Sequence, residues 1–313
     1  MIGLEHVTKK YGNTIGVQDL SFQIDQGQIV GLLGRNGAGK TTTLNLMTGY
    51  FPPDTGIVRV NQLDLVKFPR ECKRHIGYLP EKPPLYDEMT VWDYLNFVCD
   101  LRDVVSLSKK NHVNEILRVC ALEDVKDRVI GHLSKGYRQR VGFAQALCGN
   151  PEIMILDEPT VGLDPMQVVE IRTLIQKLGR DHTILFSSHI LSEVQQLCDR
   201  VLILDGGKLI RSFDLKASGD GGNIRIRLCV RAKEAVLLAE IRKIPGITQV
   251  EVLPGQSAGI VEVRVSCPEK DERGFLTDQI FHSMVFIDAP ITQMMAEKDD
   301  LESAFIATIE GDH

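Results

Sequence analysis

Long apolar runs and an excess of positive charge are both missing from this sequence. Its 313 residues carry a formal net charge of -6, and 43% are hydrophobic. No uncharged stretch approaches the roughly 18–20 apolar residues of a membrane-spanning helix, and Met1 leads into an alternating segment, unlike a signal peptide. The acidic balance argues against broad attraction to nucleic acid or acidic lipid. We therefore expect a cytosolic protein whose link to any membrane is another protein.

Signals for cysteine pairing are missing as well. The cysteines are odd in number, widely scattered and without a C-x-x-C pair, which argues against disulfides and zinc. We interpret all seven as small, mostly buried, reduced side chains: Cys72, Cys99, Cys120, Cys148, Cys198, Cys229 and Cys267.

Hydrophobic patterns predict an α/β fold for the first two thirds of the chain. Alternating runs come first, then an almost continuous apolar segment, a helical stretch over about 85–147 and further apolar strands. Strands that alternate with helices imply a parallel sheet with helices on its faces. The predicted strands are Ile2–Val7, Val17–Ile24, Gln28–Leu33, Ile153–Leu156, Thr183–Ser187 and Val201–Leu204.

A second, smaller domain is expected because 313 residues exceed one average domain. A Gly-rich segment at 218–223 is the predicted linker between a first domain at 1–217 and an α+β domain at 224–313. The predicted order is strand Ile224–Val230, helix Ala232–Lys243, strands Ile247–Leu253 and Ile260–Ser266, helix Asp271–Phe281 and strand Met284–Ile287. This is the ferredoxin-like order, and a final helix is expected at Asp300–Ile309. A structural or dimerisation role and a ligand-sensing role both stay open.

A glycine-rich motif follows the apolar segment Gln28–Leu33. Residues 34–41 fit G-x-x-x-x-G-K-[ST] in full, between a predicted buried strand and a helix. Its glycines let backbone N–H groups surround phosphate oxygens, and the helix adds the positive end of its dipole. Lys40 would bring a charge to the β and γ phosphates, and Thr41 a hydroxyl to Mg²⁺. The predicted nucleotide-binding set is Gly34, Arg35, Asn36, Gly37, Ala38, Gly39, Lys40, Thr41 and Thr42.

Two carboxylates follow the apolar strand Ile153–Leu156. Parallel α/β sheets hold their ligands at the carboxyl ends of strands, where Asp157 and Glu158 lie. Asp157 suits the Mg²⁺ partner of a phosphate-binding loop, and Glu158 is placed to orient and deprotonate the attacking water.

With these motifs in place, residues 1–216 resemble the ATPase subunits of ATP-binding cassette (ABC) transporters. Leu133–Gln139 is similar to the family signature, with Lys135 and Tyr137 where many members have Gly and Gln. A Gly162–Asp164 turn resembles the D-loop, and His189 resembles the switch histidine. The resemblance implies a P-loop NTPase with a RecA-like core, an antiparallel β subdomain and a helical signature subdomain.

Ser134 and Gly136 precede a helical segment, so a hydroxyl, backbone N–H groups and the helix dipole form a second anion site. The family implies that this helical subdomain projects away from the P-loop. Two chains would then pair head to tail on ATP, each signature capping the other chain's nucleotide. A homodimer is expected, and a heterodimer is possible.

Two further residues match family positions with alternatives open. Tyr11 matches the aromatic that stacks on adenine, although it could be an ordinary strand-edge or turn aromatic. Glu81 stands where the family usually has Gln, so it could ligate Mg²⁺ and act in catalysis, or be a plain loop acid. Arg35 is interpreted as a solvent or interface charge and not as a catalyst.

The resemblance implies an ATPase that uses ATP and Mg²⁺ to drive an integral membrane permease. The Tyr78–Glu81 segment and the Leu301–Phe305 segment most resemble ABC-2 type exporter ATPases, so export is favoured. Residues 83–91 would receive the permease, at the cytoplasmic face of the membrane. The alternatives are a non-transport ABC ATPase acting on nucleic acid or ribosomes, for which the chain lacks a coiled coil and a second cassette, and an ordinary P-loop kinase or GTPase.

Overall fold

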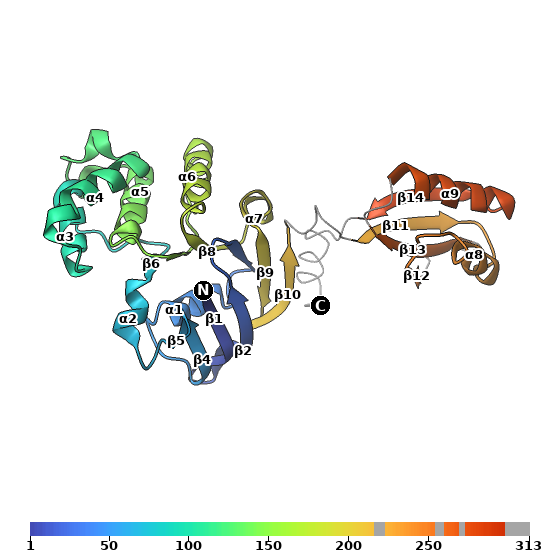
Figure 1. Cartoon of the computed structure of the whole chain (residues 1–313), viewed down its shortest axis with the longest axis horizontal. Coiled ribbons are helices and arrows are strands. Elements are labelled where there is room, and N and C mark those ends of the chain that lie inside the picture. The colour runs from blue at the N-terminus through green and yellow to red at the C-terminus, as the bar shows by residue number, and fades with distance from the viewer. Residues whose placement is uncertain (216–222, 254–259, 269–272, 298–313) are drawn as a thin grey trace. The chain divides into compact units, whose positions relative to one another are not determined.

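The chain folds into two compact units, Met1–Phe213 and Asp214–His313. The computed structural model describes residues 1–215, 223–253, 260–268 and 273–297 (Figure 1). The predicted linker lies outside the described residues except for Asn223, which begins a strand, and the helix predicted at Asp300–Ile309 lies wholly outside them.

A six-stranded sheet forms the centre of the first unit, in the order β10-β9-β3-β8-β7-β6. Neighbouring strands from β9 to β6 pair in parallel, which confirms the predicted parallel sheet. β3, β7 and β8 are buried along their whole length, as expected of strands covered on both faces. The bounds are Ile29–Leu33 for β3, Ile76–Leu79 for β6, Ile153–Leu156 for β7, Thr183–Ser188 for β8, Arg200–Asp205 for β9 and Lys208–Asp214 for β10.

An antiparallel sheet of order β2-β1-β4-β5 completes the core. Its strands are β1 Ile2–Tyr11, β2 Thr14–Ile24, β4 Thr55–Val60 and β5 Leu63–Asp64. Helix α1, Lys40–Met47, contacts β1 and β2, and apolar side chains of both sheets and of α1 form one buried cluster. The alternating burial of β2 shows why its sequence alternates, since one face packs on this core while the other meets solvent.

Helices α3, α4 and α5 form a separate group beside β6 (Figure 1). They span Val91–Leu101, Ser106–Val119 and Lys135–Leu147, joined by short 3-10 turns at Glu123–Val125 and Ile130–His132. Thr90 caps α3 by accepting the Asp93 N–H at 3.1 Å, and Ser134 caps α5 in the same way. The remaining helices of this unit are α2 Pro69–Arg74, α6 Pro165–Leu178 and α7 Leu191–Leu197.

The second unit is a four-stranded antiparallel sheet of order β12-β13-β11-β14 with two helices. This is the strand order of the ferredoxin-like arrangement. The elements are β11 Asn223–Val230, α8 Glu234–Ile241, β12 Gln249–Leu253, β13 Val261–Pro268, α9 Arg273–Phe286 and β14 Ile291–Glu297. Apolar side chains of the sheet and of both helices form its core.

The strand predicted at Met284–Ile287 is wrong, because α9 continues to Phe286 and the last strand is Ile291–Glu297. Leu276, Ile280 and Met284 are buried at helical spacing, so Met284 belongs to the apolar face of α9. Val285 and Phe286 are exposed. The prediction failed because a run of four apolar residues is too short to distinguish the periodicity of a helix from that of a strand.

Among the described side chains, the cysteines are five buried residues and the half-buried Cys229, which agrees with the prediction that they are mostly buried. Within the described part of the chain, no helix has the length and apolar character needed to cross a membrane.

Close backbone contact fixes α5 against β6. A Cβ on Gly77 of β6 would lie 2.2 Å from the Ala146 carbonyl oxygen of α5, so only glycine fits there. We expect Gly77→Ala to lower the free energy of unfolding by about 1–3 kcal/mol, the usual cost of overpacking. Chemical denaturation measures it. Gly179→Ala is the control, because the closest atoms that the Cβ would meet there belong to the side chain of Ile29, Cδ1 at 2.4 Å and Cγ1 at 2.8 Å, while the backbone oxygen of Ile175 is 3.4 Å away. Equal losses in the two variants would contradict the backbone argument.

Candidate functional site

The phosphate-binding motif lies between β3 and α1, where the sequence predicts it. A Cβ on Gly34 would lie 2.5 Å from the Leu204 carbonyl oxygen. Gly37 and Gly39 have positive φ values of 86° and 99°, a backbone conformation that glycine adopts without strain. The loop therefore needs its glycines for its own shape. Arg35, Asn36, Gly37 and Thr41 are exposed, Gly39 and Thr42 are half-buried, and Gly34, Ala38 and Lys40 are buried.

The Lys40 ammonium is held inside this loop. It donates to the carbonyl oxygens of Gly34 at 2.7 Å and Arg35 at 3.2 Å. It also lies 3.3 Å from Glu158 Oε1. A buried cation needs such partners, because removal of an ammonium from water is costly. The structure thus joins the lysine of the glycine-rich loop to the second carboxylate after β7.

Ser187, near the end of β8, connects the carboxylate of Asp157 with the backbone of Glu158. Its hydroxyl donates to Asp157 Oδ1 at 2.6 Å and accepts the Glu158 N–H at 2.8 Å. Glu158 has a positive φ of 45°, so the backbone turns sharply after β7. Non-glycine residues in this region are strained by about 1–2 kcal/mol. The turn directs the side chain of Glu158 toward Lys40 and His189.

Several neighbouring groups act on the pKa of Asp157. Burial raises the pKa of this carboxyl group, because a charged carboxylate loses hydration inside the protein. Hydrogen bonds from Ser187 and Thr41 lower the pKa, and the negative charges of Glu158 and Glu81 raise it. Thr41 thus lies within hydrogen-bond reach of Asp157, and the exposed Glu81 is near enough for its charge to act on the same carboxyl group.

His189 lies directly beside Glu158. Its Nδ1 is 2.9 Å from Glu158 Oε2, while its side chain is 44% exposed and that of Glu158 is 11% exposed. The two oxygens of Glu158 thus have different partners, Lys40 on one side and His189 on the other. The exposed edge of the imidazole leaves it open to a ligand at this end of the sheet.

This set of oxygen donors fits a magnesium ion that shares its coordination with phosphate. Within the described residues, no group of three or more His, Cys, Asp and Glu could enclose a metal. Mg²⁺ commonly takes one or two carboxylates and keeps water or phosphate oxygens for the rest. Asp157, Thr41 and Glu81 are the residues that would hold it.

Tyr11 closes one side of the glycine-rich loop. It ends β1, is 47% exposed and packs edge-on against Phe51 at a centroid distance of 5.8 Å. A Cβ on Gly16 would meet the Tyr11 ring at 2.7 Å and Thr42 Cγ2 at 3.1 Å. The tyrosine therefore has an open surface next to the start of α1.

The predicted second anion site lies at the start of α5. Ser134 is exposed, and its hydroxyl accepts the Tyr137 N–H at 3.5 Å. Gly136 is buried against α6, where a Cβ would meet the Gln167 side chain at 2.6 Å. The Tyr137 hydroxyl donates to Asp124 at 2.8 Å, so this variant residue serves the helical group itself. Asp164 caps α6 by accepting the Gln167 N–H at 2.9 Å.

Sequence reasoning missed three buried side chains that fasten the segment after β7. Gln139 of α5 donates to the Pro159 carbonyl oxygen at 2.9 Å. The Thr160 hydroxyl donates to Glu193 at 3.0 Å, although the two residues are 33 positions apart. A glutamate in the first turn of α7 carries no local signal of such a contact, because acids are common at that place in any helix.

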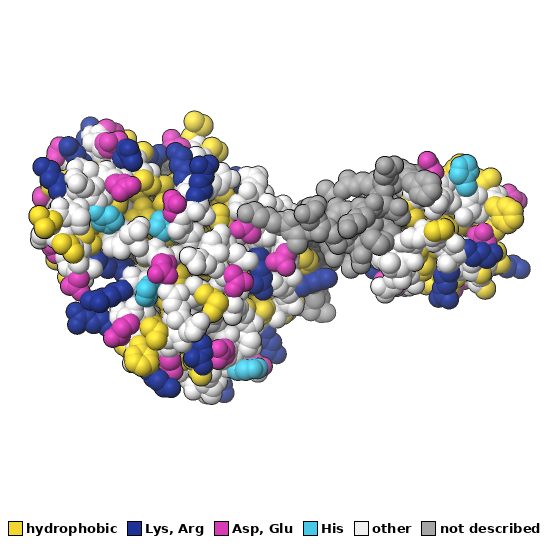
Figure 2. Space-filling model, in the orientation of Figure 1, with side chains coloured by type: hydrophobic (Ala, Val, Ile, Leu, Met, Phe, Trp, Pro, Cys, Tyr) yellow, Lys and Arg dark blue, Asp and Glu magenta, His cyan; other side chains and the backbone are white. Residues whose placement is uncertain are grey.

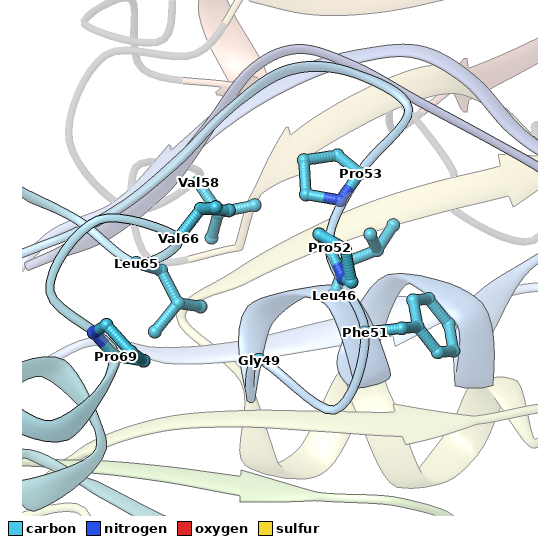
Figure 3. Close-up of a pocket in the computed structure, with 9 residues that line it drawn as sticks. All are labelled: Leu46, Gly49, Phe51, Pro52, Pro53, Val58, Leu65, Val66 and Pro69. Atoms are coloured by element: carbon cyan, nitrogen blue, oxygen red, sulfur yellow. The ribbon is translucent and has the colours of Figure 1, made fainter.

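A small apolar hollow of about 230 Å³ lies elsewhere in the first unit (Figure 3). It contains no residue of the glycine-rich loop and no charged side chain, so it is a poor candidate for phosphate chemistry. Its lining is Leu46, Gly49, Phe51, Pro52, Pro53, Val58, Leu65, Val66 and Pro69.

Comparison with known families and relatives agrees with this geometry. The family model described as ABC transporter matches residues 17–161. The chain is 37% identical to the bacitracin transport ATP-binding protein BcrA of Bacillus licheniformis, over 75% of this chain and 77% of that protein. It is 41% identical to the ABC transporter ATP-binding protein NatA of Bacillus subtilis, over 62% of this chain and 80% of that protein.

Solved structures show the same fold. One, described as the ATP-binding subunit of an ABC transporter, has a TM-score of 0.64 at 29% identity and covers 70% of this chain and 91% of its own. Another is the dimeric post-hydrolysis state of the ATP-binding cassette MJ0796 bound to ADP and Pi. It has a TM-score of 0.63 at 25% identity, over 69% of this chain and 99% of its own.

The raised pKa of Asp157 means that its charge at neutral pH opposes folding. We expect Asp157→Asn to raise the unfolding temperature by a few degrees at pH 7. The difference should shrink as the pH falls toward 3.8, the usual aspartate value, because the original side chain then takes up its proton. Thermal unfolding at several pH values measures it.

Asp54→Asn is the control for this experiment, because the pKa of Asp54 is shifted in the opposite direction. Hydrogen bonds from Lys9 and Lys10 lower the pKa of Asp54, so its loss should not stabilise the chain. A fall in unfolding temperature at pH 7 in Asp157→Asn would contradict the burial argument.

Proposed function

The chain belongs to the family of ABC transporter ATP-binding proteins, and from this premise we propose that it hydrolyses ATP to drive a separate membrane permease in the direction of export. Its relatives include proteins named for bacitracin transport and linearmycin resistance. We further propose an ABC-2 type permease and a position at the cytoplasmic face of the membrane.

The observation that carries the ATPase function is the contact of Glu158 with both Lys40 and His189. A glutamate held between a lysine of the phosphate-binding loop and an imidazole can orient a water beside the terminal phosphate. Glu158 would accept the proton of that water, and Lys40 would carry positive charge to the phosphate oxygens. His189 would hold Glu158 in position through its Nδ1.

Asp157, Thr41 and Glu81 would hold Mg²⁺, which when bound neutralises phosphate charge. Ser187 keeps Asp157 and Glu158 in a fixed relation while the ion and nucleotide exchange. Tyr11 offers its exposed ring to the adenine, since an aromatic face can stack on a base. Gly34 to Thr42 supply the N–H groups and hydroxyls for the phosphates.

We propose that the start of α5 completes the nucleotide site of a second copy. Ser134 and Lys135, at the start of this thirteen-residue helix, are exposed to solvent, and helix N-termini favour anions. The solved cassette MJ0796 is a dimer with ADP and Pi. An ATP-dependent homodimer of this chain, or a heterodimer with a related one, would have each Ser134 near the partner's phosphates.

A basic groove offers a surface for the permease. It lies between α2 and the C-terminal end of α3, has a volume of about 970 Å³ and contains two exposed aromatic or apolar side chains, Tyr50 and Leu101. Arg70 and Arg74 are 80% and 59% exposed, and both lie near Asp103. Such a surface suits a cytoplasmic segment of the permease that carries acidic and apolar side chains.

Residues 83–91 lie at the other end of α3 and stay a second predicted contact.

The alternative function on nucleic acid has less support. Lys and Arg are interspersed with Asp and Glu on the face that Figure 2 shows, whereas a nucleic acid track needs clustered positive charge. The basic groove is a local feature with Asp103 inside it. For the second unit we propose a structural or dimerisation role.

Charge reversal in the groove should weaken the permease contact. We expect the double variant Arg70→Glu, Arg74→Glu to reduce co-purification of the permease from native membranes by at least about tenfold, because two attractive charges become repulsive. Lys177→Glu, an exposed reversal on α6, is the matched control and should keep the permease. Unfolding temperatures check that the variants are folded. Equal capture by both variants would exclude the groove as the permease surface.

Glu158→Gln tests the hydrolytic step. We expect the rate to fall by about 10²–10⁴-fold, because an amide cannot accept the proton of water. ATP affinity should hold or improve, since Lys40 loses an ionic partner within the protein. The variant should therefore accumulate as an ATP-filled dimer, which light scattering detects with Mg-ATP and which ADP should return to monomer.

Glu152→Gln, at the opposite end of β7, is the matched control and should hydrolyse at the original rate. An unchanged rate in Glu158→Gln would remove the general-base role. A variant that is slow but stays monomeric at saturating Mg-ATP would remove the dimer mechanism.

A further inference from the structure

We propose that Glu193 is a positioning residue for hydrolysis, holding the segment that carries Glu158 and the segment that carries His189 as one unit. This inference rests on the proposed ATPase function. It concerns three buried residues of the first unit, Thr160, Ser188 and Glu193, which are 6%, 1% and 2% exposed. They are called the Glu193 latch below.

One oxygen of Glu193 joins two loops. Its Oε2 accepts the Thr160 hydroxyl at 3.0 Å and the Ser188 hydroxyl at 2.9 Å. Thr160 lies two residues after Glu158, and Ser188 lies directly before His189. The latch thus fastens the backbone immediately beside both members of the Glu158–His189 pair. Hydrogen bonds to a charged group are stronger than those between neutral groups, so two of them can hold a short loop in one arrangement.

The Ser188 hydroxyl also sets the backbone beyond His189. While it donates to Glu193, it accepts the Ile190 N–H at 3.0 Å. His189 therefore lies between two atoms of one hydrogen-bonded ring, the Ser188 hydroxyl and the Ile190 N–H. This restricts the direction of the His189 side chain, whose exposed position gives it few other restraints.

The charge of Glu193 explains why the latch is strong. Its Oε1 lies 3.5 Å from the Arg172 guanidinium of α6, a longer contact than the two hydroxyl bonds. A buried carboxylate with one guanidinium at that distance still requires hydrogen-bond donors, because an unsatisfied charge is costly inside a protein. The two hydroxyls supply them, so the carboxylate draws Thr160 and Ser188 together.

The same segment is held from the other side by α5. Gln139 donates to the Pro159 carbonyl oxygen, and Thr160 follows Pro159 directly. Pro159 is therefore held by Gln139 of α5, and Thr160 is held by Glu193, which also binds the segment before His189. A shift of α5 on dimer formation would reach His189 through the latch, which gives the latch a role beyond stability.

The closing experiment compares hydroxyl deletion with hydroxyl retention. Thr160→Val keeps the shape but removes the donor, whereas Thr160→Ser keeps the donor. We expect Thr160→Val to lower the single-turnover rate of Mg-ATP hydrolysis by about 10-fold to 10²-fold, the range in which small misplacements of catalytic groups lie. Binding of fluorescent mant-ATP should stay within about twofold, and Thr160→Ser should restore most of the rate. Thr173→Val, which removes a hydroxyl that bonds only within α6, is the matched control.

A His189→Ala background distinguishes positioning from general stability. If the latch acts by holding His189 against Glu158, Thr160→Val should lower the rate there by less than about twofold, since the pair that the latch holds is already broken. Radiolabelled ATP resolves the slow rates. A full multiplicative loss in that background, a rate in Thr160→Val equal to that of Thr173→Val, or a parallel loss of mant-ATP binding would each overturn the proposal.

Two further results keep the inference separate from the proposed function. If the unchanged chain binds but does not hydrolyse Mg-ATP, the ATPase proposal fails and the latch with it. If the unchanged chain hydrolyses and Thr160→Val does not fold, Ser188→Ala decides by the same comparisons, because it removes the other donor to Glu193. An original rate in Ser188→Ala would then overturn the latch.

Discussion

The Ser187 hydroxyl is the contact on which the catalytic end of the sheet depends. It is a donor to the Asp157 carboxylate and an acceptor for the Glu158 N–H, so one side chain of β8 fixes the side chain of the first acidic residue after β7 and the backbone of the second. The parallel pairing of β7, β8 and β3 makes this possible, because their carboxyl ends lie at one edge of the sheet. The glycine-rich loop, the acidic pair and His189 then meet although up to about 150 residues separate them in sequence.

Motifs with a local cause were predictable from sequence. The strand Ile153–Leu156 matches β7 residue for residue, and the glycine-rich loop lies between strand and helix, because both signals depend on neighbours in the chain. Contacts across the fold were not predictable. The contacts from Glu193 to Thr160, from Gln139 to Pro159 and from Ser187 to Glu158 each span 20 or more positions, and nothing in the immediate neighbours of these residues specifies those partners. The misplaced last strand has the same origin, since the core decided how Met284 packs.

Charge distribution explains why the site combines buried and exposed groups. Lys40, Asp157 and Glu158 are sheltered from water, so their mutual electrostatic forces are strong, whereas His189, Tyr11 and Ser134 have open surfaces for ligands. Buried, fixed charges together with solvent-accessible ligand contacts suit an enzyme that must release its products and bind new substrate in each cycle. The solvent-facing groups can change partners without rearrangement of the buried charges.

The left-handed backbone conformation of Glu158 costs stability at a residue whose side chain the catalytic site needs. A glycine at this position would relieve the strain of the turn, yet it would offer no oxygen to Lys40 or His189. The same change would also remove an ionic partner of the buried Lys40, so relief of the turn alone would not make the protein more heat resistant. Substitutions meant to raise the thermal stability of this protein would therefore have to leave this turn unchanged and lie elsewhere in the fold.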